Sequence, residues 1–167
     1  MQKYFYMKNP TYDKILEIAA VIALLVGFYP LLYYSSIDSN AVLPTHYNII
    51  GEVDGWGDRS VLWTMALIGL TFYIGLSVLQ KFPQIYNYPC KVTEQNAHYL
   101  YRLGVQLIRQ MKVLLVLIFA YANNSIYRVA IGKTIGPDGF IVSVFLLLML
   151  SLLTIYIVKM MRYKSKV

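Results

Sequence analysis

The sequence predicts an all-α integral membrane protein, a four-helix bundle with an ordered extracytoplasmic loop between its first two helices. Of its 167 residues, 58% are hydrophobic and only 14% are charged, which is unlike the composition of a soluble globular domain. Apolar residues gather in four blocks that lack Asp, Glu, Lys, Arg and His, at 18–34, 61–79, 113–127 and 140–158. A helical span needs roughly 20 apolar residues to cross a hydrocarbon core of about 30 Å. We therefore expect one membrane domain, 1–167.

The four blocks define the expected helices. We predict spans at about 15–35, 61–80, 108–128 and 139–159, with an outer motif loop at 35–60 and an inner basic loop at 81–107. Pro30 should kink the first span, because proline removes a backbone hydrogen bond. The third block is the shortest and contains Asn123, Asn124 and Ser125, which we interpret as polar capping near the helix end.

Basic residues are distributed unequally between the two sides of these spans. One side carries 12 of the 15, namely Lys3, Lys8, Lys14, Lys81, Lys91, Arg102, Arg109, Lys112, Lys159, Arg162, Lys164 and Lys166. By the positive-inside rule, both termini are then cytoplasmic and the loop at 35–60 faces outward. The net charge of +7 is thus a topology signal, and we predict no nucleic-acid partner.

Ionisable residues are missing from the interiors of the predicted spans. Coupled transporters place such groups inside the membrane, so the pattern argues against transport. Glu17, near the start of the first span, is expected to be solvated or paired with a lysine. The single cysteine, Cys90, excludes an intramolecular disulfide and a cysteine-cluster metal site.

The stretch 43–58 is a polar segment in an apolar chain, and its candidate ligand side chains are His46, Asn48, Glu52, Asp54 and Asp58. Three interpretations remain open. A divalent metal could use His46, Glu52, Asp54 and Asp58, although their spacing matches no strong metal motif. His46 with Asp54 or Glu52 could act as a general base. Alternatively, these side chains hydrogen-bond the loop's own backbone, with glycines supplying the turns.

The same stretch resembles the signature Pro-x-His-x-Asn-x-x-Gly-x-x-Asp-x-x-Gly of a bacterial membrane domain of unknown function found in SdpI-type immunity proteins. Its specified places are filled by Pro44, His46, Asn48, Gly51, Asp54 and Gly57, and the resemblance extends over about 43–102. It implies a multi-pass protein of the bacterial cytoplasmic membrane with the motif outside. SdpI-type proteins protect cells from a secreted peptide toxin, but they have further spans after this domain, so immunity does not carry over from the resemblance alone.

Our leading functional prediction is a non-enzymatic binding, sensing or immunity-type module. Its outer loop would recognise an extracytoplasmic peptide, a lipid headgroup or a membrane protein partner, and the chain could form an oligomer within the lipid bilayer. One alternative is a metal-dependent membrane enzyme, or a subunit of one, acting on an envelope substrate. Another is an accessory subunit with a purely structural loop. The predicted binding residues are Pro44, His46, Asn48, Gly51, Glu52, Asp54, Trp56 and Gly57.

Overall fold

The computed structural model describes residues 10–48, 52–134, 136 and 139–164, and it confirms the four-helix membrane fold. The helices are α1 (Pro10–Phe28), α2 (Val61–Leu79), α3 (Ala97–Ala130) and α4 (Gly139–Lys164), with short 3-10 helices η1 (Tyr29–Ser36) and η2 (Pro83–Ile85). Four helical segments are long and apolar enough to cross a membrane, and the first of them includes η1. The protein is therefore a multi-pass membrane protein.

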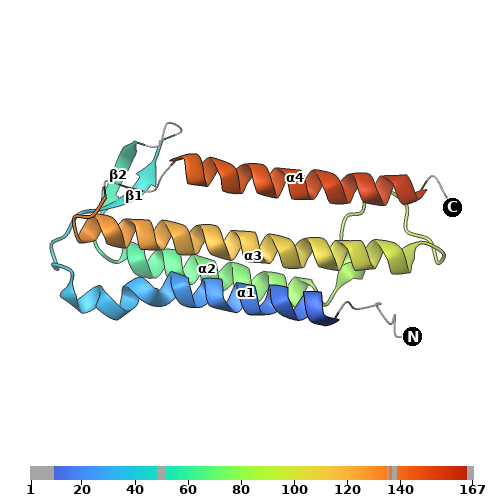
Figure 1. Ribbon diagram of the computed structural model, residues 1–167, viewed down its shortest axis with the longest axis horizontal. Coiled ribbons are helices and arrows are strands. Elements are labelled where there is room, and N and C mark those ends of the chain that lie inside the picture. Colours follow the sequence, from blue (N-terminus) through green and yellow to red (C-terminus); the bar gives the residue numbers. More distant parts are fainter. Residues whose placement is uncertain (1–9, 49–51, 135, 137–138, 165–167) are drawn as a thin grey trace.

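A small antiparallel sheet of two strands, β1 (Leu43–Tyr47) and β2 (Val53–Gly57), lies between α1 and α2 in the sequence. This hairpin sits at one end of the bundle, and α1 begins and α4 ends at the other (Figure 1). We call these the hairpin end and the terminal end. The ordered loop predicted at 35–60 is described on both sides of residues 49–51, which lie outside the described residues.

Helix α3 is the centre of the bundle. Helices α1 and α2 pack against α3 and against each other, whereas α4 packs chiefly against α3. Much of α4 is consequently exposed, including Leu147 and Leu150, as expected for a helix whose surroundings are lipid. The inner basic loop predicted at 81–107 is helical from Ala97 on, because α3 begins there and continues into the third span. Leu100 and Leu103 in this first part of α3 pack against Tyr156 and Met160 of α4.

The Asn123–Asn124 pair does not cap a helix end, as we had interpreted it, but joins α3 to α1. Asn123 is fully buried and donates to the carbonyl of Gly27 at 2.8 Å. Asn124 donates to the carbonyl of Val26 at 2.8 Å. In an α-helix that carbonyl would accept from the N–H of residue 30, which Pro30 does not have. The amide therefore compensates for the proline where α1 passes into η1.

An ion cluster occupies the terminal end of the α1–α2–α3 interface. The ammonium of Lys112 is fully buried, 2.6 Å from the Glu17 carboxylate and 3.0 Å from the Ser77 hydroxyl. Arg109 lies 2.7 Å from Asp13. Pairing of Glu17 with a lysine was one of the two expected outcomes. The expectation of spans without interior ionisable groups is wrong at this end, because Lys112 points into the helix packing.

The hairpin is attached to the bundle by apolar and polar contacts. Leu43, at the start of β1, is buried with Leu62 of α2 and Ile126 of α3. The Arg59 guanidinium donates to the carbonyl of Ile37 at 2.6 Å and lies over the ring of Tyr34. These contacts fix both sides of the connection, so the hairpin is held on the bundle rather than extending freely from it.

Candidate functional site: a bulged hairpin above a lateral cavity

The hairpin register is interrupted twice. Leu43 pairs with Gly57 and Pro44 with Trp56, but the next pair is His46 with Gly55, which leaves Thr45 as an extra residue in β1. The following pair is Tyr47 with Val53, which leaves Asp54 as an extra residue in β2. A bulge redirects side chains and is frequent beside functional sites. Here one bulge lies on each side of His46.

The two bulges bring His46 and Asp54 together. The imidazole Nδ1 lies 2.5 Å from the Asp54 Oδ1, and the two side chains are 71% and 43% exposed. Because a carboxylate only accepts, Nδ1–H is the donor, and Nε2 is directed away as the second polar atom of the ring. The pair therefore presents an oriented imidazole and a carboxylate to solvent.

Asn48 and Glu52 close the turn of the hairpin. The N–H of Asn48 donates to the Glu52 carbonyl at 2.8 Å, and the N–H of Glu52 donates to the Asn48 side-chain oxygen at 2.9 Å. The Asn48 amide also donates to the Glu52 carboxylate at 3.1 Å. These contacts give Asn48 a structural role in the turn. Gly51, predicted as a motif residue, lies outside the described residues.

The two glycines of β2 are required by close packing against β1. A Cβ at Gly55 would lie 2.8 Å from the Cβ of His46, and one at Gly57 would lie 2.7 Å from a methyl carbon of Thr45. Pro44 in β1 is buried, whereas Trp56, its paired residue in β2, is 58% exposed. The glycines thus allow the strands to approach at the bulges, and Trp56 is an exposed aromatic side chain two residues after Asp54 in β2.

The four candidate metal ligands do not converge. His46 and Asp54 bind each other, Glu52 binds Asn48, and Asp58 accepts from the Ser60 N–H at 2.6 Å at the start of α2. Hydrogen bonds from Ser60 hold the pKa of Asp58 below its ordinary value. Within the described part of the chain, no group of three or more His, Cys, Asp or Glu side chains could hold a metal ion.

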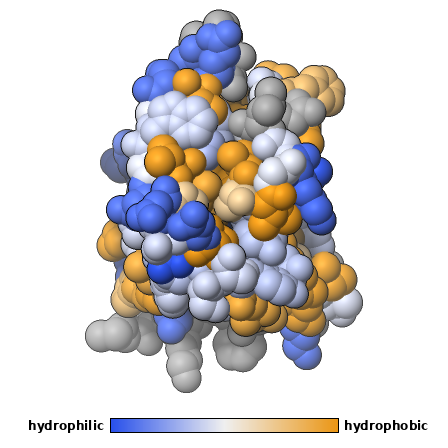
Figure 2. Space-filling view, turned by 90° about the vertical axis from the view of Figure 1, so that its left-hand side faces the viewer, coloured by the Kyte–Doolittle hydropathy of each residue, from blue (hydrophilic) through white to orange (hydrophobic). Residues whose placement is uncertain are grey.

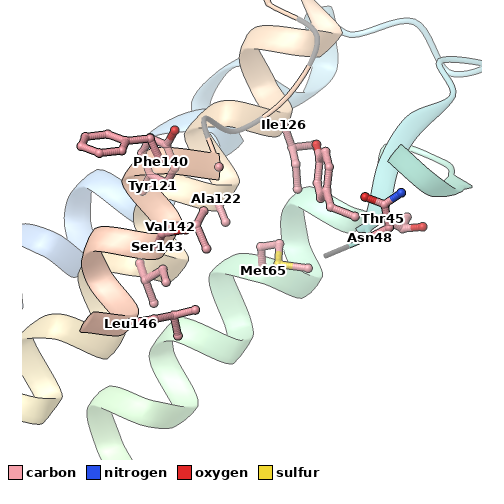
Figure 3. Close-up of a pocket in the computed structure, with 13 residues that line it drawn as sticks. Thr45, Asn48, Met65, Tyr121, Ala122, Ile126, Phe140, Val142, Ser143 and Leu146 are labelled. Carbon is pink, nitrogen blue, oxygen red and sulfur yellow. The ribbon is translucent and has the colours of Figure 1, made fainter. Parts of the chain in front are cut away.

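A cavity of about 710 Å³ lies beneath the hairpin, between α2, α3 and α4 (Figure 3). It is mostly apolar, with polar groups contributed by the hairpin, by Tyr121 of α3 and by Ser143 of α4. Its lining is Thr45, Tyr47, Asn48, Met65, Ile118, Tyr121, Ala122, Ile126, Gly139, Phe140, Val142, Ser143 and Leu146.

Tyr47 is the cavity residue that sequence reasoning missed. Its hydroxyl is buried and has no hydrogen-bond partner among the described residues. Burial, and to a lesser extent the neighbouring Tyr121, raises the pKa of Tyr47 to about 12. Position 47 is an unspecified place in the motif between His46 and Asn48, so only its alternation with His46 along the strand hints at an inward side chain.

A match to a known protein family covers only part of the chain. No curated protein and no solved structure matches it. Residues 18–70, which run from α1 through the hairpin into α2, match the family described as a domain of unknown function, DUF1648.

Proposed function

We propose that this protein is a recognition module of a bacterial cytoplasmic membrane, with its hairpin on the outer face and a secreted peptide as its ligand. The observation that carries the proposal is the exposed His46–Asp54 pair, aligned by two bulges, with exposed Trp56 two residues after Asp54 in β2. A polar pair with an adjacent aromatic on an anchored hairpin is suited to binding, because little ordering entropy is lost on association. Hydrophilic side chains lie beside apolar ones on the surface of this end (Figure 2).

The solvent exposure of the His46–Asp54 pair argues against a structural role for it. A solvent-exposed ion pair contributes only about 0–1 kcal/mol to stability, and the hairpin is already fixed by Leu43, Asn48 and Arg59. The bulges that align His46 with Asp54 disrupt strand pairing. An arrangement that weakens the sheet to expose a polar pair favours an external role for that pair.

The orientation rests on charge and on the fold. Most basic residues lie on the side of the terminal end, and α1 begins and α4 ends there together (Figure 1). The resemblance of the hairpin segment to SdpI-type immunity proteins favours a peptide over a lipid headgroup or a membrane protein as the ligand. The metal-dependent enzyme is the weaker candidate, since Glu52 and Asp58 are directed to other partners.

Cysteine labelling of intact cells tests the orientation. A Cys90→Ser variant carrying Trp56→Cys should react with a membrane-impermeant maleimide, whereas the native Cys90 should react only after the membrane is opened. Labelling of Cys90 in intact cells with protection of position 56 would reverse the assigned orientation.

Site-specific photocrosslinking tests the recognition. A benzophenone amino acid is placed at position 56 of the protein in cells that also secrete the ligand. It should yield an adduct with a small secreted peptide, identified by mass spectrometry. The adduct should be lost in His46→Ala and Asp54→Asn, while both variants melt like the wild type. The matched control is the same probe at Val42, which is exposed on the connection before β1. An adduct with lipid or with a larger protein, or one that persists in both variants, would overturn the peptide assignment.

A further inference from the structure

We propose that the cavity beneath the hairpin is a lipid site, which takes one acyl chain of a membrane lipid with its ester carbonyl against the hydroxyl of Tyr47. The cavity is lined mainly by membrane-spanning helices, and neither His46 nor Asp54 lines it. The proposal therefore stands apart from the recognition function.

The depth of the cavity matches one leaflet. Its walls run over residues 118–126 of α3 and 139–146 of α4, which is about 12 Å along a helix at 1.5 Å per residue. One leaflet of a hydrocarbon core about 30 Å thick is about 15 Å deep. A chain entering below the hairpin would therefore stay within the leaflet on that side.

The cavity walls become more polar toward the hairpin, as a lipid becomes more polar from its acyl chains to its ester groups. Met65, Ala122 and Leu146 contribute apolar surface within the bundle, and the hairpin contributes Thr45 and Asn48 at its end (Figure 3). Met65 and Leu146 come from helices α2 and α4, which both pack on α3 and leave space between them. The cavity is thus bounded by helices that lipid tails surround, and its polar rim lies at the hairpin.

Tyr47 supplies the specific polar contact. Its hydroxyl is buried at the cavity without a hydrogen-bond partner among the described residues. A buried donor left unpaired is costly, and an ester carbonyl is an acceptor of the right kind at the depth where acyl chains begin. None of the described lining residues is charged, so the contact recognises the ester region and not the charge of a headgroup.

The cavity is too short to seat a transmembrane helix along its length. Its walls run over about 12 Å of α3 and α4, whereas a helix that crosses the hydrocarbon core is about 30 Å long. An acyl chain, which extends through one leaflet only, matches the length of these walls.

Photolabelling in defined vesicles tests the site. The full chain is reconstituted in phosphatidylcholine vesicles containing a small fraction of phosphatidylcholine with a diazirine in one acyl chain, and adducts are mapped by mass spectrometry. We expect labelling at Ala122 and Val142. Filling the cavity with Val142→Trp should lower it roughly ten-fold, and Tyr47→Phe should lower it about five-fold.

Val144→Trp is the matched control, because Val144 is exposed on the same helix but does not line the cavity. It should label like the wild type. Ala122→Leu provides a smaller filling change if Val142→Trp fails to fold. Equal labelling of Ala122→Leu, Val142→Trp and the wild type would overturn the lipid site. So would conversion of a dimer into a monomer by Val142→Trp, since that result would place a second copy in the cavity.

Discussion

The side-chain amide of Asn124 donates to the carbonyl of Val26, across 98 positions of sequence. That carbonyl is the acceptor that Pro30 would serve in a helix if it had an N–H. Asn124 and Pro30 are therefore linked, because a backbone carbonyl that loses its helical partner needs another hydrogen-bond donor where the hydrocarbon core contains no water.

The Asn124 contact should depend on the proline. Asn124→Ala should lower the free energy of unfolding in detergent by about 1–2 kcal/mol. In a Pro30→Ala background, residue 30 regains its N–H and can serve Val26 itself, so the same substitution should cost clearly less. A double-mutant cycle from denaturant titrations measures the difference. An equal cost in both backgrounds would show that the amide does not compensate for Pro30.

Lys112 should be the costliest single charge to remove. It is fully buried, and its partner Glu17 is about one-third exposed. Removing one member of a buried pair costs about 3–5 kcal/mol, and the partial exposure of Glu17 reduces this to about 2–4 kcal/mol for Lys112→Ala. Combination with Glu17→Gln should be less than additive. Lys133→Ala, at an exposed loop position, is the control and should change stability little. Full additivity would contradict the pairing.

Much of the helical fold could be predicted from the sequence, because uninterrupted apolar blocks of span length have few alternatives. The strands were not predicted. Pro44 lies in β1 and Gly55 and Gly57 lie in β2, and proline and glycine are depleted in strands. Their tolerance here depends on the bulges, and bulges are set by packing that no local pattern records.

Long-range pairing limited the prediction of the site. The polar stretch was identified, but the division of its residues between structure and exposure needed the register, which separates Asn48 and Glu52 at the turn from His46 and Asp54. Lys112 was counted with the basic residues on the inner side of the membrane. Its burial follows from partners about 35 and 95 residues away, which a single sequence does not reveal.

Replacing a hairpin glycine by alanine should have the opposite effect on stability from replacing a helical glycine. Gly55→Ala should destabilise the protein by about 1–3 kcal/mol, because its Cβ would meet the Cβ of His46. Gly75→Ala in α2, where nothing lies within 4 Å of the added Cβ, should instead stabilise the helix by about 0.5–1 kcal/mol. Thermal melts of the two variants should therefore shift in opposite directions. A melt of Gly55→Ala at or above the wild-type temperature would contradict the close strand approach.

Chelation should leave stability unchanged. The candidate ligands engage other partners in the described structure, so melting temperatures before and after treatment with a chelator should agree. Elemental analysis of the purified protein should find no stoichiometric metal, in the wild type or in His46→Ala. A melting temperature that falls on chelation in the wild type but not in His46→Ala and Asp54→Ala would instead support the metal-dependent enzyme.

Tyr47 should titrate with a pKa of about 12, because burial disfavours its phenolate. A folded pKa above the ordinary value of 10 means that the native state retains the proton more strongly than the unfolded chain. The associated stability is therefore fully present below pH 10 and is lost as the pH rises from 10 to about 12. The difference in phenolate absorbance between wild type and Tyr47→Phe should show a single group with this late midpoint. Removing that group should also flatten the loss of melting temperature over the same pH range. A midpoint near 10 for the difference titration would show that the hydroxyl is hydrated, and so would remove the unpaired donor from the cavity.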